Sequence, residues 1–149
     1  MNPVYEFSAD PARVDGARVH RWLSEESYWA QGRTRAQHDA AMSASRNYGV
    51  YVRASGLQVA YARVVTDGVG FGWLCDVFVD AGVRGAGIGS ALVEGVLADL
   101  EPLGLKRILL ATADAQELYR PFGFSELTGP MVWMARTRDA SVAGDTPRS

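Results

Sequence analysis

The sequence predicts an α/β (α+β) domain in which helices cover both faces of a mixed sheet. A length of 149 residues with 48% hydrophobic content suits one domain with a buried core. Strand-like and helix-like segments follow one another in the order strand, two helices, three strands, helix, strand, helix, strand. Helices that connect strands in this way are expected to pack on both sides of the sheet.

The composition excludes several classes of protein. The 15 Lys and Arg residues against 17 Asp and Glu give a formal net charge of −2 and form no basic stripe, so we expect neither a nucleic acid nor a membrane as partner. The N-terminal residues carry charges where a signal peptide is apolar. Cys75 is the single cysteine, which excludes an internal disulfide and a CxxC metal site. We therefore expect a cytoplasmic protein without a metal.

The first elements are marked by capping residues. Residues 4–7 form a short apolar run and are expected to be a strand. Asp10, followed by a proline, caps a predicted helix over about 11–24. Thr34 and the glutamine three residues later form a capping box, which predicts a second helix over about 35–43.

Three strands and a long helix follow. Val-rich and Tyr-rich segments between turn residues predict strands at residues 48–53, 57–65 and 70–79. The third strand is almost continuously apolar, which is typical of a strand covered on both faces. A glycine-rich stretch then leads into a helix, because Ile88, Leu92 and Val96 repeat at four-residue spacing.

Short elements complete the chain. Residues 107–111 read as a buried strand, and Asp114 is expected to cap a brief helix that ends before Pro121. Residues 131–135 predict a last strand. Residues 137–149 are polar and without pattern, so we expect a flexible tail.

The loop before the long helix has the composition of an anion-binding loop, with the residues Arg84, Gly85, Ala86, Gly87, Ile88, Gly89 and Ser90. Small residues allow several backbone N–H groups to converge, and the helix N-terminus adds a positive potential, so the loop suits a phosphate. Its glycine spacing differs from the GxGxxG of dinucleotide-binding folds. The alternative is a tight turn that packs the helix on the strand.

A second motif, LYRPFGF at Leu118–Phe124, lies downstream of this loop. With both motifs in this order, the sequence resembles the GCN5-related N-acetyltransferase (GNAT) superfamily, whose signatures are Q/R-x-x-G-x-G/A and L-Y-x-x-x-G-F. The resemblance covers residues 48–124 strongly. It implies a mostly antiparallel sheet, flanked by helices, whose central strands splay apart.

The resemblance also implies where acetyl-CoA binds. The cofactor would lie in the V-shaped opening between the splayed strands, with its pyrophosphate on the glycine-rich loop. The pantetheine arm would bond, as an added strand does, to the backbone of Val77, Phe78 and Val79. The family often has an Asn at a further pantetheine contact, where this chain has Thr112.

Acetyl transfer to an amine needs a neutral amine, a stabilised oxyanion and a proton for the departing thiolate. The resemblance assigns the proton donor to Tyr119, and a tyrosine of the core is the alternative. Asp76 is our candidate for the base or for an anchor of the ammonium group, because an unpaired carboxylate is costly to bury in an apolar strand. A structural Asp bonded to loop amides is the alternative.

The remaining chemically active side chains have simpler explanations. Asp114 and Glu117 are expected to form a capping box. His20 and His38 lie on predicted helices, where a lone His is usually a surface or core residue. Cys75 is expected to be a buried apolar side chain.

The acceptor is expected opposite the cofactor, beside the first helices and their loop. The candidate residues there are Trp22, Glu26, Tyr28, Trp29 and Trp73. Aromatic rings with carboxylates suit an amine that carries a cation or a ring. They equally suit a plain hydrophobic core.

The function expected from these observations is that of an N-acetyltransferase. A single domain over residues 1–136 would transfer the acetyl group of acetyl-CoA to a primary amine of a small molecule or peptide, by direct attack in a ternary complex. The alternative is a non-catalytic CoA-binding regulatory module. The sequence leaves open the identity of the acceptor and whether the protein is a homodimer.

Overall fold

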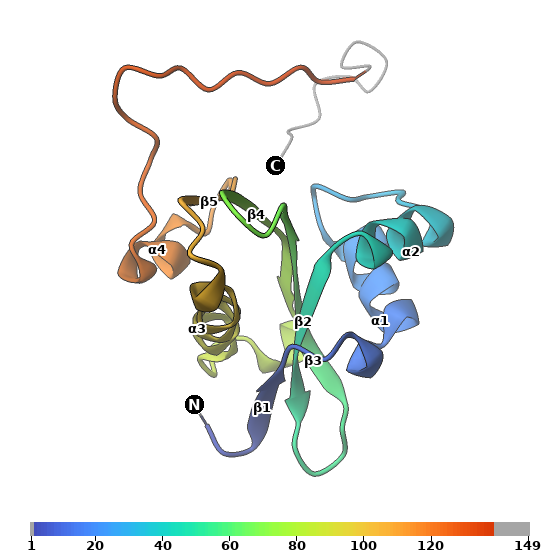
Figure 1. Cartoon of the computed structure of the whole chain (residues 1–149). Helices are drawn as coiled ribbons and strands as arrows, with labels where there is room; N and C mark the ends of the chain where they lie inside the picture. The colour runs from blue at the N-terminus through green and yellow to red at the C-terminus, as the bar shows by residue number, and fades with distance from the viewer. Residues whose placement is uncertain (1, 139–149) are drawn as a thin grey trace.

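Five strands form one twisted mixed sheet in the computed structural model, which describes residues 2–138 (Figure 1). In chain order they are β1 (Tyr5–Ser8), β2 (Arg46–Val52), β3 (Gln58–Thr66), β4 (Phe71–Val79) and β5 (Arg107–Leu109). Neighbours in the chain are neighbours in the sheet, and only the β4–β5 pair is parallel. The predicted mixed, mostly antiparallel sheet is confirmed.

Helices cover both faces of this sheet, as expected. They are α1 (Gly16–Arg21), α2 (Arg35–Ser43), α3 (Ile88–Leu100) and α4 (Gln116–Tyr119). Figure 1 shows α3 and α4 on one side of the strands and α1 and α2 on the other. Two separate clusters of buried side chains correspond to the two faces, one containing Leu92 and Val96 of α3, the other Val19 of α1 with Phe78.

The predicted helix over 11–24 is interrupted in the structure. Asp10 caps only a 3₁₀ turn, Pro11–Arg13, by accepting a hydrogen bond from the N–H of Ala12. The chain is then extended at Val14, and Asp15 begins α1 by accepting from the N–H of Arg18 at 3.0 Å. Two competing caps within six residues therefore divide one expected helix into two.

One of the predicted helix caps is confirmed and another is wrong. The capping box of Thr34 and Gln37 is present at the start of α2. Asp114 does not cap α4, whose N-cap position is Ala115 and carries no side-chain cap. Instead, the hydroxyl of Thr112 accepts a hydrogen bond from the N–H of Ala115 at 3.0 Å.

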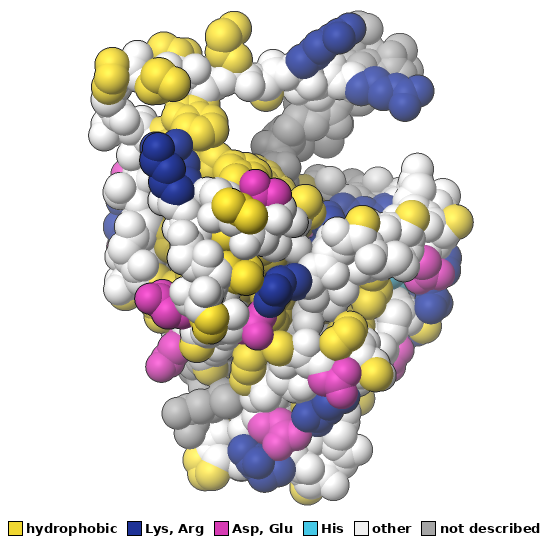
Figure 2. Space-filling model, in the orientation of Figure 1, with side chains coloured by type: hydrophobic (Ala, Val, Ile, Leu, Met, Phe, Trp, Pro, Cys, Tyr) yellow, Lys and Arg dark blue, Asp and Glu magenta, His cyan; other side chains and the backbone are white. Residues whose placement is uncertain are grey.

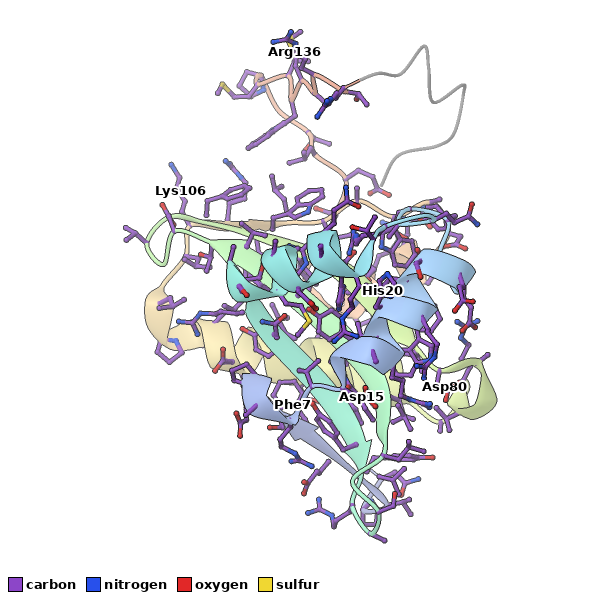
Figure 3. All side chains as sticks on the ribbon, turned by 90° about the vertical axis from the view of Figure 1, so that its right-hand side faces the viewer. Phe7, Asp15, His20, Asp80, Lys106 and Arg136 are labelled. Carbon is purple, nitrogen blue, oxygen red and sulfur yellow. The ribbon has the colours of Figure 1, made fainter. Side chains whose placement is uncertain are left out.

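The predicted strand at residues 131–135 is absent. The segment makes no ladder with any strand of the described chain, and Met131, Val132 and Met134 are 75%, 83% and 92% exposed. Figure 2 shows hydrophobic side chains along its arch, and Figure 3 places Arg136 above the body of the domain. A strand requires a partner, which an apolar pattern by itself does not supply. Of the predicted tail, residues 139–149 lie outside the described part of the chain.

No helix within residues 2–138 has the length and apolar content needed to cross a bilayer. The same residues contain no group of three or more His, Cys, Asp or Glu side chains placed to hold a metal ion.

Candidate active site

The central strands β4 and β5 separate after a short contact. They pair only at Phe71–Arg107, Gly72–Ile108 and Trp73–Leu109. From Leu74 onward β4 has β3 on one edge and no strand of residues 2–138 on the other. Backbone groups on that open edge can bond a ligand, except the carbonyl of Val79, which accepts a hydrogen bond from Arg84. A cavity of about 660 Å³ lies in this opening.

A β-bulge in β4 shapes the floor of the cavity. The pairing with β3 shifts register between Tyr61 and Arg63, opposite Asp76, which adopts a φ of 53°. A non-glycine residue in this left-handed region is strained by about 1–3 kcal/mol and persists only where its surroundings hold it. The side chain of Asp76 meets Trp29 and Arg33 of the loop that precedes α2, and Arg63 of β3.

The glycine-rich loop borders the cavity at the other end of β4. Gly85 and Gly87 have φ values of 90° and 77°, and Gly87 is the N-cap of α3. The loop residues that line the cavity are Arg84, Gly85, Gly87, Ile88, Gly89 and Ser90, whereas Ala86 is not part of the wall. The N-terminus of a helix of 13 residues therefore opens onto the cavity, as an anion-binding site requires.

The residues expected beside the pantetheine arm also border the cavity. They are Val77, Phe78, Val79 and Thr112. Arg84 donates a hydrogen bond from Nε to the carbonyl of Val79 at 2.9 Å and lies over the ring of Phe78. Thr112 uses its hydroxyl within the loop before α4, as described above.

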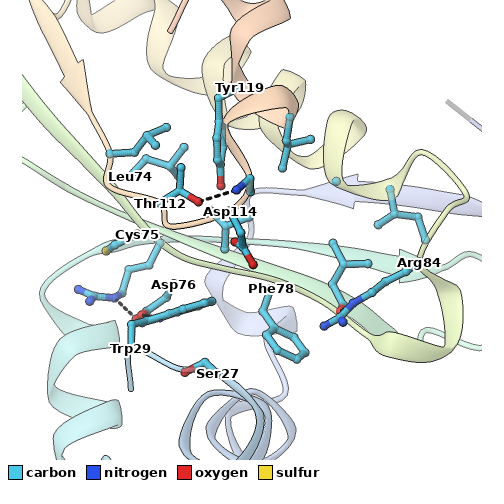
Figure 4. A pocket seen from close by; sticks show the side chains of 18 of the residues that line it. Ser27, Trp29, Leu74, Cys75, Asp76, Phe78, Arg84, Thr112, Asp114 and Tyr119 are labelled. Atoms are coloured by element: carbon cyan, nitrogen blue, oxygen red, sulfur yellow. Dashed lines mark hydrogen bonds and ion pairs between the residues drawn. The ribbon is translucent and has the colours of Figure 1, made fainter. Parts of the chain in front are cut away.

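Tyr119 extends from α4 into the cavity, with its hydroxyl end toward β4 (Figure 4). Its ring is in edge contact with Phe124, with centroids 5.8 Å apart. The side chain is almost fully buried, and burial, together with the nearby Tyr28 and Asp114, raises the pKa of the phenol to about 12. Tyr119 therefore holds its proton at neutral pH.

Asp76 accepts hydrogen bonds from three side chains, of which Figure 4 labels Trp29. Arg33 donates from both terminal nitrogens at 2.7 and 3.2 Å, Arg63 from Nε at 2.9 Å and Trp29 from Nε1 at 2.9 Å. Burial alone would raise the pKa of Asp76, but the hydrogen bond and charge of Arg33 and the charge of Arg63 outweigh it and hold the pKa below its usual value. We call Trp29, Arg33, Arg63 and Asp76 the Asp76 cluster.

Four of the five residues predicted for the acceptor line the cavity, namely Glu26, Tyr28, Trp29 and Trp73. Trp22 does not. It is 5% exposed and stacks on Phe78 with centroids 5.4 Å apart, so it is a core residue, the alternative that the sequence left open.

Sequence reasoning missed Arg33 and Arg63, which line the cavity and pair with Asp76. Arg63 lies inside the Val-rich segment of β3, where a charge among apolar residues was a usable signal. Cys75 also lines the cavity, but burial raises its pKa to about 11, so it is a thiol at neutral pH rather than a nucleophile.

Comparisons with known proteins agree with this fold. The model of the Acetyltransferase (GNAT) family matches residues 16–124. A crystal structure of a GNAT-family protein from Xanthomonas campestris pv. campestris is 38% identical, with a TM-score of 0.84, and the match covers 91% of this chain and 94% of that one.

Two further relatives share parts of the chain or its fold. Serotonin N-acetyltransferase 2, chloroplastic, of Oryza sativa subsp. japonica is 37% identical over 73 residues, which are 48% of this chain and 36% of that protein. Rv2747 of Mycobacterium tuberculosis, whose structure was determined in complex with CoA, is 23% identical with a TM-score of 0.68, covering 95% of this chain and 86% of that one.

The splayed mixed sheet and the glycine-rich loop at the start of the central helix are the arrangement expected from the resemblance to acetyltransferases. The chain belongs to the GNAT family of acetyltransferases. Acetylation with acetyl-CoA is general for this family.

Proposed function

We propose that the protein transfers the acetyl group of acetyl-CoA to a primary amine of a small molecule or peptide, by direct attack of the amine in a ternary complex. One observation carries this proposal: a single cavity contains the glycine-rich loop, Tyr119 and the Asp76 cluster. Both substrates can therefore meet in one cavity, and no covalent intermediate on the protein is needed.

The residues present fit acetyl-CoA. The helix N-terminus at Gly87 offers backbone N–H groups to the pyrophosphate. The open edge of β4 at Val77 and Phe78 offers hydrogen bonds to the pantetheine amides, while the carbonyl of Val79 is already bonded to Arg84. Bound there, acetyl-CoA would supply the thioester that the amine attacks.

Tyr119 would stabilise the negative charge that develops on the departing sulfur. Its pKa of about 12 exceeds the value of about 8.5 of an ordinary thiol, so complete proton transfer is uphill by roughly 5 kcal/mol. A hydrogen bond from the phenol that shortens as the C–S bond breaks avoids most of that cost. We therefore propose that Tyr119 acts as the proton donor through this hydrogen bond, with the proton only partly transferred to sulfur in the transition state.

Asp76 has two proposed roles that differ in chemistry. As a base it would need a free lone pair, yet its two oxygens accept four hydrogen bonds, which is about the capacity of a carboxylate. Its lowered pKa also makes it a weaker base. These contacts favour a positioning role, in which Asp76 holds Arg33 and Arg63, over the predicted role as base.

Release of CoA thiol, followed with dithiobis(nitrobenzoate) across a panel of amines, tests the proposal. We expect thiol release that depends on the amine and is lost when Tyr119→Phe and Gly87→Val are combined. Tight CoA binding without thiol release for any amine would instead identify a CoA-binding module.

A further inference from the structure

The Asp76 cluster carries one more positive charge than negative. Arg33 and Arg63 share the single carboxylate of Asp76, and no other ion pair reaches either arginine within residues 2–138. Arg63 also donates from a terminal nitrogen to the hydroxyl of Ser45, which is neutral. One guanidinium charge is therefore left without a counter-charge in contact with it.

This charge is poorly solvated. The side chains of Arg33 and Arg63 are only 19% and 14% exposed, and that of Asp76 is 2% exposed. Each guanidinium has five N–H groups, of which two have partners among the described residues. A partly buried cation with free donors is costly unless an anion pairs with it.

The place of the cluster excludes the phosphates of the cofactor as that anion. Arg33 reaches Asp76 from the loop before α2, on the face of the sheet that α1 and α2 cover. The glycine-rich loop begins α3, on the opposite face. The cavity touches both, so the cluster faces the half in which the acceptor would lie.

From these observations we infer that the acceptor carries an anionic oxyacid group, a carboxylate or a phosphate, which binds to Arg33 and Arg63. The inference rests on the proposed function, because it names the class of amine that the same cavity takes. A planar guanidinium fork matches the oxygens of either group. The rings of Trp29 and Tyr28 are in edge contact, with centroids 4.9 Å apart. They would contact the rest of the acceptor.

Binding of small anions to the CoA-loaded protein tests the site without requiring turnover. The probe is the NMR signal of the Trp29 indole N–H, which donates to Asp76. Acetate or inorganic phosphate is expected to shift this signal saturably, whereas acetamide is not, and the better of the two anions identifies the group. Arg63→Gln is expected to abolish the shift, while Arg63→Lys retains part of it and shows that the charge is responsible.

Arg35→Gln is the matched control, because Arg35 pairs with Asp39 on α2 and does not line the cavity. Equal shifts with acetate and acetamide, or an acetate shift that survives Arg63→Gln, would overturn the inference. Anion binding at the cluster without thiol release for any amine would contradict the proposed function but support the anion site.

A second experiment measures turnover with pairs of amines. Amino acids are compared with their amides, and O-phosphoethanolamine with ethanolamine, by thiol release. We expect the anionic member of the preferred pair to have a kcat/KM at least about tenfold higher, the ratio that one charge-assisted hydrogen bond supports. Neutral amides that react as well as the acids, with phosphoethanolamine no better than ethanolamine, contradict the inference.

Discussion

The hydroxyl of Tyr28 accepts a hydrogen bond of 2.9 Å from the backbone N–H of Ala113. The two residues are 85 positions apart in the chain and belong to loops on either side of the cavity. This bond ties the loop that carries Trp29 to the segment that follows β5. We expect this bond to restrict how far the two loops can separate.

Removing this hydroxyl should loosen the acceptor site. For Tyr28→Phe we expect the KM for the amine to rise by up to about tenfold, since one neutral hydrogen bond contributes about 0.5–1.5 kcal/mol. The Kd for CoA, measured by calorimetry, should change little. Tyr5→Phe, in β1 and away from the cavity, is the control. Weaker CoA binding with an unchanged KM for the amine would show that the link serves the cofactor instead.

Gly87→Val should weaken CoA binding by at least about tenfold. A β-branched residue at a φ of 77° is strained, and its side chain would stand at the helix N-terminus where backbone N–H groups must approach the pyrophosphate. Gly56→Val controls for the strain, because Gly56 has a φ of 78° in the β2–β3 turn outside the cavity. Calorimetry that finds CoA bound to Gly87→Val as tightly as to the parent would remove the loop from the cofactor site.

Tyr119→Phe should separate chemistry from binding. The ring and its edge contact with Phe124 remain, so folding should change little. We expect kcat to fall by about 10², or roughly 2.7 kcal/mol, with the Kd for CoA nearly constant. An unchanged kcat with weaker acetyl-CoA binding would make Tyr119 a cofactor contact, and another group would then have to protonate the thiolate.

Asp76→Asn should reduce stability strongly, because it leaves two poorly solvated guanidinium groups without a counter-charge. Removing one partner of a buried ion pair costs about 3 kcal/mol, or about 10 °C in Tm for a chain of this size. Asp39→Asn removes an exposed partner of Arg35 and should change Tm by less than about 2 °C.

The pH profile distinguishes the two roles of Asp76. Because its folded pKa is lowered, Asp76 stabilises the fold above its unfolded pKa of about 3.9, and this stability is lost as the pH falls through the folded pKa. If Asp76 positions the arginines, kcat/KM in Asp76→Asn should keep the shape of its pH profile. Disappearance of the acidic limb in that variant would identify Asp76 as the base.

His38 should make the protein less stable in mild acid. Its side chain is 1% exposed, and neither ring nitrogen has a hydrogen-bond partner among the described residues. Burial lowers its pKa most, followed by the charges of Arg33 and His20. The charges of Asp76 and Asp39 oppose this shift but do not cancel it. The unfolded chain binds a proton at this position near pH 6.5 while the folded chain does not, so stability is retained above that pH and falls below it.

The expected result is a lower Tm at pH 5 than at pH 7 in the parent protein, with a smaller difference in His38→Gln. His20→Gln should keep most of the difference. An identical pH dependence in the parent and in His38→Gln would assign the effect to other groups.

Local signals in the sequence determined much of the fold. The capping box at Thr34, the glycine-rich loop before α3 and the apolar strand β4 each depend on backbone preferences within a few residues, and all three are present. The prediction of a strand at residues 131–135 was wrong for the opposite reason. An apolar run becomes a strand only beside another strand, and residues far apart in the chain decide that.

The tertiary structure alone decided how the acceptor half of the site is built. Arg33 and Arg63 lie 43 and 13 positions from Asp76, whose carboxylate meets both from a bulge at a φ of 53°. The sequence indicated that Asp76 needed a partner, because an unpaired carboxylate in an apolar strand is costly. Which partner it has depends on strand register and on the path of the loop before α2, and neither follows from residue preferences over a short span.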